Sequence, residues 1–354
     1  MTQAKHKFSY EWTLKDANFT KDKGTVFSCF SCGGGSTMGY KLAGFDVIGC
    51  NEIDPKMMDV YKLNHNPKFS FLESITTFKD KKDLPKELFN LDILDGSPPC
   101  SSFSMSGNRE KDWGKNKKFR EGQKKQILDT LFFDFIDLAK RLQPKVVIAE
   151  NVKGILLGAA KKYVRRIYKE FDKAGYYCQH FLLDASKMGV PQRRERVFFV
   201  CLRKDLAGQF LYQKDMFTQV PKLELNFNEK PILFGEVKEN NLCRAKIPPS
   251  TLKHWENANH TGRSKFGLNN TFGFLYKALD SLVCATIVSS VSNCYSIESS
   301  PDKLTDSEIE KCSTFPSDYN YLANKVQYIC GMSVPPVMTA QIATRIYQQW
   351  LSRI

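Results

Sequence analysis

The stretch LDILDGSPPCSSFSMSGNR, residues 91–109, places one cysteine between a rigid segment and a polar one. Pro98 and Pro99 each fix a backbone angle and hold the thiol of Cys100 at the end of an apolar run, whereas the serines after it form a polar loop. Ligands of α/β proteins bind at the carboxyl ends of strands, so Cys100 is a candidate nucleophile. The alternative is a small buried residue, the commoner role of a single cysteine.

The polar loop continues into a strongly basic run, NREKDWGKNKKFREGQKKQ. Its basic residues are Arg109, Lys111, Lys115, Lys117, Lys118, Arg120, Lys124 and Lys125. A charge run is usually solvated surface. A basic loop hinged beside a nucleophile can instead close over a phosphate backbone, which makes nucleic acid a candidate substrate.

A glycine-rich turn, FSCFSCGGGSTMGY, follows another predicted strand. Glycines at this place let the backbone turn tightly and approach a ligand at the start of a helix. Glu52 ends the next strand, where a carboxylate can bind the two hydroxyls of a ribose. The pattern indicates an adenosine-containing cofactor, with a tight structural turn as the alternative. Its spacing differs from G-x-G-x-x-G and so argues against a dinucleotide.

Two further segments place charged residues beside apolar runs. In AENVKG, Glu150 follows a strand, and an apolar pocket there would let it carry a proton at neutral pH. A helix-capping pair of Glu150 and Asn151 is an equally good interpretation. In VPQRRERVFFV, Arg194 and Arg196 alternate into a strand and are predicted to project from one face, where burial demands acceptors. Solvent-facing arginines on an edge strand are the alternative.

Alternating strand-like and helix-like runs predict an α/β fold with a doubly wound, mostly parallel, Rossmann-like sheet. The predicted strands are residues 24–30, 45–54, 91–96, 146–151, 176–184 and 196–202, and the predicted helices 55–66, 127–142 and 159–175. The rhythm stops after residue 202, and the last segment again has a helical pattern. We therefore expect a catalytic and cofactor-binding domain over residues 20–205, a smaller inserted domain over 206–320, and a C-terminal segment, 321–354, that returns to the first domain.

Composition limits the class of protein. The 354 residues are 42% hydrophobic and 25% charged, as in soluble globular proteins, but the net charge of +14 points to nucleic acid as the first partner to consider. A polar N-terminus and the lack of a long uncharged apolar segment favour a cytoplasmic protein. Eleven scattered cysteines do not suggest a disulfide framework, and no second pair completes a zinc site with Cys29 and Cys32. We expect no metal.

Taken together and in order, six motifs resemble those of the C5-cytosine-specific DNA methyltransferases, of the bacterial restriction–modification or orphan type. They are FSCFSCGGG, NEID, GSPPCSSFS, AENVKG, QRRER and a late GMSVPP. The resemblance covers residues 25–202 and 304–351 and leaves the middle unmatched. It implies that the inserted region is a target-recognition domain that reads bases from the major groove of duplex DNA.

The resemblance also implies a mechanism. The thiolate of Cys100 attacks C6 of a cytosine flipped out of the duplex, and C5 then accepts a methyl group from S-adenosylmethionine. Glu150 would bond N3 and the exocyclic amine, Arg196 the base carbonyl, and Arg194 would help to organise the site. Asn151 would fix the loop that carries the nucleophile. The products are 5-methylcytosine and S-adenosylhomocysteine.

For the cofactor, the resemblance implies a set of binding residues: Phe30, Gly33, Gly34, Gly35, Glu52, Ile53, Glu73, Gly96, Pro99, Ser333 and Val334. For DNA, the expected contacts are Ser102, Arg109, Lys117, Lys118, Gln192, Arg244 and Arg263. The expected partners are double-stranded DNA and a cognate restriction endonuclease, with the protein a monomer in the cytoplasm, associated with the nucleoid.

The chain departs from the family pattern at a few positions. Cys32 replaces a glycine, Ser101 a glutamine and Met332 an asparagine, and Glu73 stands where an aspartate usually contacts the adenine. Three rival functions remain open. An RNA-directed relative is the nearest, because one subgroup with these motifs modifies tRNA. A catalytically silent nucleic-acid-binding protein would not need Cys100, and a nicotinamide oxidoreductase would leave the basic loop unexplained.

Overall fold

The computed structural model describes residues 6–99, 130–158, 160–215, 218–240, 243–261 and 275–354, together with short strands at 116–117, 126–127, 264–266 and 270–272. The chain divides into two units. Unit 1 comprises Met1–Asn18, Asp184–Arg194 and Phe227–Gln341, and unit 2 comprises Phe19–Leu183, Glu195–Asn226 and Ile342–Ile354. The units divide the chain at other residues than the predicted domains, because residues 184–194 and 321–341 fall in unit 1 and residues 206–226 fall in unit 2.

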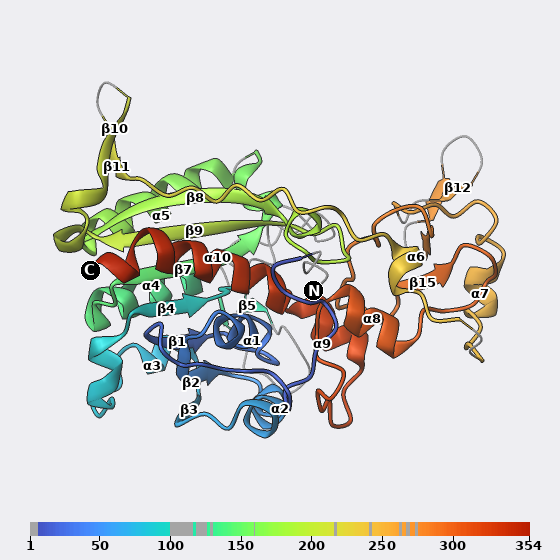
Figure 1. Ribbon diagram of the computed structural model, residues 1–354, viewed down its shortest axis with the longest axis horizontal. Coiled ribbons are helices and arrows are strands. Elements are labelled where there is room, and N and C mark those ends of the chain that lie inside the picture. The colour runs from blue at the N-terminus through green and yellow to red at the C-terminus, as the bar shows by residue number, and fades with distance from the viewer. Residues whose placement is uncertain are drawn as a thin grey trace, which may run out of the picture. The chain divides into compact units, whose positions relative to one another are not determined.

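A seven-stranded sheet with the order β3-β2-β1-β4-β7-β9-β8 forms the centre of unit 2 (Figure 1). Its strands are β1 (Thr25–Cys29), β2 (Asp46–Glu52), β3 (Phe69–Leu72), β4 (Ile93–Gly96), β7 (Val146–Val152), β8 (Tyr176–Asp184) and β9 (Glu195–Arg203). The pairs from β3 through β7 are parallel, and β9 is antiparallel to β7. The predicted α/β fold with a doubly wound, mostly parallel sheet is confirmed.

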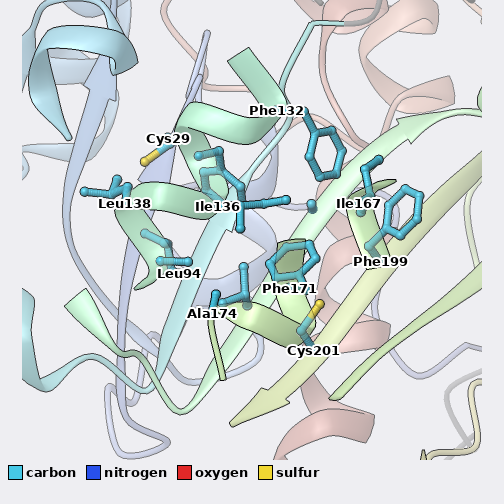
Figure 2. Packing of buried hydrophobic residues seen from close by; sticks show 14 of the residues in the cluster. Cys29, Leu94, Phe132, Ile136, Leu138, Ile167, Phe171, Ala174, Phe199 and Cys201 are labelled. Carbon is cyan, nitrogen blue, oxygen red and sulfur yellow. The ribbon is translucent and has the colours of Figure 1, made fainter. Parts of the chain in front are cut away.

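Helices α3 (Ile75–Phe78), α4 (Leu131–Leu142) and α5 (Ala160–Lys173) cover one face of the sheet. Alternate strand residues such as Leu94 and Phe199 point into this layer, where they meet Phe132, Ile136 and Phe171 from the helices (Figure 2). Because these side chains are fully buried, they supply most of the hydrophobic stabilisation of the unit.

The other face of the sheet is covered by α1 (Gly35–Leu42) and by the last residues of α10 (Pro336–Gln349). Phe45 packs edge-to-face against Tyr40 of α1 and Tyr347 of α10, with ring centroids 6.1 Å apart in each pair. The helix α2 (Pro55–His65) follows β2, and Asp54 caps its N-terminus by accepting a hydrogen bond from the backbone of Lys56.

Unit 1 contains α6 (Phe234–Val237), α7 (Pro249–Leu252), α8 (Asp306–Cys312), α9 (Val326–Met332) and the parallel pair β14 (Leu275–Ala278) and β15 (Cys294–Ile297). A buried ion pair links its segments. Arg244 Nη2 lies 2.5 Å from Glu308 Oε1, and the two side chains are 6% and 0% exposed. Glu308 also completes a capping box with Thr305 at the start of α8.

The remaining strands are short pairs: β5 (Asn116–Lys117) with β6 (Gln126–Ile127), β10 (Leu211–Asp215) with β11 (Thr218–Pro221), and β12 (Ser264–Phe266) with β13 (Asn270–Phe272). Within the described ranges, no helix has the length and apolar character needed to cross a membrane.

Candidate active site

The sheet of unit 2 reverses its strand order between β1 and β4, and ligands of open α/β sheets bind at such a point. The register brings Asn51, Cys29, Gly96 and Ala149 into one row across β2, β1, β4 and β7. The residues that follow this row therefore emerge at one edge. The glycine turn, Glu52, Pro98, Pro99 and Glu150 all lie there.

The glycine turn after β1 is tightly constrained. Phe30 and Cys32 adopt φ of 53° and 46°, left-handed values that cost non-glycine residues energy. Gly34 has φ 82° and caps α1, and Gly35 begins the helix. Cys32 thus takes, at an energetic cost, a conformation that favours glycine.

The imidazole of His65 supports the turn from α2. Its Nε2 donates to the carbonyl of Gly33 at 3.2 Å. Burial lowers the pKa of His65 to about 3, so the ring is neutral and the proton on Nε2 remains available for this bond. A Cβ added to Gly34 would lie 2.2 Å from the same nitrogen, so only glycine fits there.

Glu52 ends β2 with its carboxylate fixed by three backbone donors. Oε2 accepts from the N–H of Cys32 at 2.7 Å, and Oε1 accepts from Ile53 and Asp54 at 2.8 and 2.9 Å. Burial raises the pKa of Glu52, and the three donors oppose that rise. Each carboxylate oxygen offers about two lone-pair sites, so Oε2 keeps one acceptor site for a further donor.

The segment that leads to Cys100 is held from the side of β7. Asn151 Nδ2 donates to the carbonyl of Pro98 at 3.2 Å, and its Oδ1 accepts from the N–H of Val152 at 2.9 Å. Gly96 leaves no space for a side chain, because a Cβ there would lie 2.6 Å from the ring of Phe135. Pro98 is buried and Pro99 half-buried. The backbone is therefore fixed up to the residue before the candidate nucleophile.

Glu150 and Arg196 form an ion pair across two strands. Arg196 lies opposite Val152 in the antiparallel pair of β7 and β9, so it is a diagonal neighbour of Glu150 on the same face. Its Nε is 3.0 Å from Glu150 Oε1, and the side chains are 16% and 13% exposed. The surroundings of Glu150 are therefore not purely apolar, because this guanidinium adjoins it. Burial lowers the pKa of Arg196 and Glu150 opposes that change.

Asp95 lies beneath this edge on β4, and nothing in the sequence analysis singled it out. Its carboxyl accepts from Ser28 Oγ at 2.9 Å and from the Tyr40 hydroxyl at 3.0 Å. Burial raises the pKa of Asp95 to about 7, and the charge of Glu150 adds to the rise. Its only sequence signal was a carboxylate inside the apolar run LDILDG.

We expect Asp95→Asn to stabilise the protein, and to do so more at high pH. An unfolded Asp ionises near pH 4, so between about pH 4 and 7 the folded state binds more protons than the unfolded state, and wild-type stability falls as the pH rises through that range. Asparagine cannot ionise, and each pKa unit corresponds to about 1.4 kcal/mol. Urea unfolding at about pH 5 and about pH 8 measures this, and a variant no more stabilised at the higher pH would contradict it.

Three residues predicted for catalysis or cofactor binding, Arg194, Ser333 and Val334, belong to unit 1. The prediction that Arg194 projects from a strand beside Arg196 is wrong, because β9 begins at Glu195. The Arg194 guanidinium instead donates to the carbonyls of Ile287 and Gly331, each at 2.9 Å. Ser333 ends α9, where its hydroxyl donates to Ile329, and Val334 beside it is buried.

Two predicted DNA contacts are not supported by their surroundings. Gln192 is 0% exposed. Its amide donates to the carbonyl of Cys312 and accepts from the N–H of Ile287, so it joins segments inside unit 1. The guanidinium of Arg244 donates hydrogen bonds to the carboxylate of Glu308 and to the carbonyls of Glu239 and Lys303.

Other predicted residues have competing contacts or lie outside the structure described. The Glu73 carboxylate accepts from the Thr77 hydroxyl at 3.1 Å and pairs with Lys81 at 3.1 Å, so its approach to an adenine stays a prediction. The candidates outside the described residues are Cys100, Ser102, Arg109, Lys118 and Arg263, as well as the side chain of Lys117. No cluster of three or more His, Cys, Asp or Glu suited to a metal ion occurs among the residues that are described.

Comparisons with known proteins place this site in a family. The model of the C-5 cytosine-specific DNA methylase domain matches residues 24–348. A Type II methyltransferase of Fusobacterium nucleatum, M.FnuDI, is 38% identical over 182 residues, which are 51% of this chain and 47% of that protein. M1.HphI of Haemophilus parahaemolyticus is 25% identical over 336 residues, covering 91% and 86% of the two chains. The chain thus spans about half the length of the first relatives that it matches.

Solved structures agree on the fold. A DNA modification methyltransferase encoded within an Escherichia coli prophage superposes with a TM-score of 0.66 at 18% identity, over 92% of this chain and 99% of that one. A DNMT2 variant of Spodoptera frugiperda gives 0.63 at 16% identity, over the same shares. With a family model matched from the first strand to the last long helix, the chain belongs to the C-5 cytosine-specific DNA methylases.

Proposed function

We propose that the protein is a DNA (cytosine-5-)-methyltransferase, which transfers a methyl group from S-adenosylmethionine to C5 of a flipped-out cytosine in duplex DNA through a covalent bond between Cys100 and C6. One observation carries the proposal. At a single sheet edge, the Glu150–Arg196 ion pair adjoins a backbone that Asn151 fixes two residues before Cys100. An acid group and a guanidinium at one sheet edge, with a cysteine two residues after the fixed backbone in the sequence, are groups that suit addition to a polarised ring.

Each group has a distinct task in this proposal. The Cys100 thiolate forms a bond to C6, which makes C5 electron-rich. Once C5 carries the methyl group, loss of the C5 proton and cleavage of the bond to C6 release Cys100 and leave 5-methylcytosine. Glu150, oriented by Arg196, bonds N3 and the exocyclic amine and stabilises the added proton on the ring. Arg196 also contacts the base carbonyl. Asn151 is a positioning residue, because it binds the backbone before the nucleophile and not the base.

The residues present fit S-adenosylmethionine. Glu52 Oε2 has an acceptor site for a ribose hydroxyl, and Gly33, Gly34 and Gly35 bring backbone rather than side chains to the same edge. When bound, the cofactor supplies the methyl group. We propose that Phe30, Ile53, Gly96 and Pro99 line its place in unit 2. Cofactor contacts from Glu73, Ser333 and Val334 stay predictions.

We expect Gly34→Ala to weaken S-adenosylmethionine binding at least about tenfold, because the new Cβ displaces His65 and with it the glycine turn. Gly175→Ala is the matched control. Its φ of 95° imposes the same backbone strain, but a Cβ there meets nothing within 4 Å. Calorimetric titration of both variants with the cofactor measures the effect. Equal affinities for the two would contradict it.

The inserted region of unit 1 is proposed to recognise the DNA target, and the basic loop with Ser102, Arg109, Lys117 and Lys118 to contact the phosphates, together with Arg263. The relatives are named Type II methyltransferases, which supports the proposal of a restriction–modification role with a cognate endonuclease. A monomer that acts on chromosomal DNA in the cytoplasm completes the proposal.

The test is transfer of labelled methyl from S-adenosylmethionine to mixed-sequence duplex DNA and, in parallel, to total tRNA. Duplex containing 5-fluorocytosine is included, because the fluorine blocks the elimination that releases the enzyme. We expect label on DNA and a stable protein–DNA complex that Cys100→Ala abolishes. Label on tRNA alone would overturn the choice of substrate, and no label on either would overturn the proposed activity.

A further inference from the structure

The exposed face of α5 carries a dense group of positive charges. Lys161, Lys162, Arg165, Arg166 and Lys169 are all exposed, whereas the opposite face of the helix is buried in the core. We call these five residues the α5 basic face; α5 is the green helix of Figure 1. None of the site residues proposed above belongs to it.

The acids of α5 offset this face only in part. They pair with lysines outside it, although the charges of Arg166 and Lys169 add to the effect of Lys173 in lowering the pKa of Glu170. Glu170 pairs with Lys173 at 2.9 Å, and Asp172 pairs with Lys204 at 2.6 Å. As far as the structure is described, Lys161, Lys162, Arg165 and Lys169 have no ion-pair or hydrogen-bond partner for their side chains. Arg166 differs, because its guanidinium lies 3.8 Å from the centre of the Phe133 ring.

The charges also do not serve the helix itself. Lys161 and Arg165, like Lys162 and Arg166, are four residues apart, and like charges at that spacing destabilise a helix. The first turn contains no acidic residue, although the helix dipole favours anions there and disfavours cations. Both effects destabilise the helix, and binding of an external anion would explain why these positive charges are present.

The position of the α5 basic face indicates which anion it binds. β7 ends at Val152, and α5 begins shortly after the intervening turn at Lys153–Leu156, so its first turns lie at the sheet edge that carries Glu150. Residues four apart in a helix are separated by about 6 Å along its axis. The side chains of Lys161 and Arg165, like those of Lys162 and Arg166, therefore form a row of positive charges that can follow a phosphate backbone. A regular polyanion that reaches this edge is nucleic acid.

We propose that the α5 basic face is an additional binding site for the phosphate backbone of duplex DNA, and that it extends the contact beyond the flipped cytosine. This inference rests on the proposed function for its substrate. It requires no base contact, so it contributes affinity and not sequence preference.

The test compares two variants of equal charge. The face variant carries Lys161→Gln, Lys162→Gln, Arg165→Gln and Lys169→Gln, and it keeps Arg166 because of its packing on Phe133. The control carries Lys62→Gln, Lys82→Gln, Lys86→Gln and Lys140→Gln. These four lysines are also exposed, but they lie near the opposite edge, at the end of α2, before β4 and at the end of α4.

Binding of mixed-sequence duplex DNA is measured over a range of salt concentrations, without cofactor. Each phosphate contact contributes about 0.9 to the magnitude of the slope of log affinity against log salt concentration. In the face variant we expect this magnitude to fall by about 2 to 4, and the affinity at low salt to fall at least about tenfold. The control keeps the wild-type slope. An unchanged slope in the face variant, or an equal loss in the control, would overturn the proposal.

Methyl transfer to the same DNA separates this inference from the proposed function. The face variant is expected to raise KM and to leave kcat unchanged. If the face variant lowers the salt slope of DNA affinity but the protein transfers no methyl group, the proposed function is wrong and this inference stands. If the face variant does not fold, Lys162→Gln by itself, with an expected slope change of about 0.9, decides the matter.

Discussion

Glu150→Gln is expected to lower kcat for methyl transfer by about 10² to 10⁴ without loss of folding. The amide has the shape of the carboxyl group and can still accept from Arg196 Nε, which now lies 3.0 Å from Oε1. It cannot supply the charge that stabilises a protonated cytosine ring. Binding of DNA and cofactor should change much less than turnover, because the group acts on the ring after addition of the thiol.

Glu195→Gln is the matched control for this variant. Glu195 lies on β9 beside Arg196, is exposed, and pairs with Lys153 at 2.8 Å, so its loss removes a charge close to the site without touching the proposed ring contacts. Its turnover should stay within a factor of about three of wild type, since an exposed pair contributes little. Single-turnover kinetics on duplex DNA distinguish the two. A Glu150→Gln protein with near wild-type kcat would refute the proposed role.

The sequence predicted most of the central sheet. Strands that are mostly buried, such as β1, β2 and β9, appeared within a few residues of their actual bounds. β3, with the sequence FSFL, escaped prediction, and none of its four residues is buried. β4 is equally short, but all its residues are buried and it was predicted, so burial decided what could be found.

Motifs identified the groups at the sheet edge, but not their surroundings. Glu150, Asn151 and Glu52 lie at strand ends as expected, since local sequence fixes where a strand stops. The guanidinium beside Glu150 comes from a strand about 45 residues later, and only the pairing of β7 with β9 brings it there. His65 likewise supports the glycine turn from a separate helix, and no spacing in the chain signals that contact.

The buried polar residues of unit 1 were the hardest to predict. Gln192 and Arg244 were expected to contact DNA, but long polar side chains can contact a ligand only where they are exposed. Four of their partners, Ile287, Glu308, Cys312 and Ser313, lie 64 to 121 residues away in the chain. Burial of such groups is favourable only when tertiary structure supplies every partner, which a sequence pattern does not show.

Arg244 therefore provides the test of unit 1. Arg244→Met keeps the apolar stem and removes the guanidinium, so it leaves the fully buried carboxylate of Glu308 without its cation. Loss of one partner of a buried pair costs about 3 to 5 kcal/mol, and we expect a loss of that size in the free energy of unfolding.

Lys246→Met is the control, because this neighbouring lysine is 71% exposed and its pair with Asp302 should contribute less than about 1 kcal/mol. Urea unfolding followed by tryptophan fluorescence measures both variants, and duplex DNA binding is measured at a temperature where both are folded. Arg244→Met should lose stability and retain DNA affinity per folded molecule. If it instead keeps wild-type stability and loses DNA affinity, Arg244 contacts DNA after all, and its pair with Glu308 opens when the duplex binds.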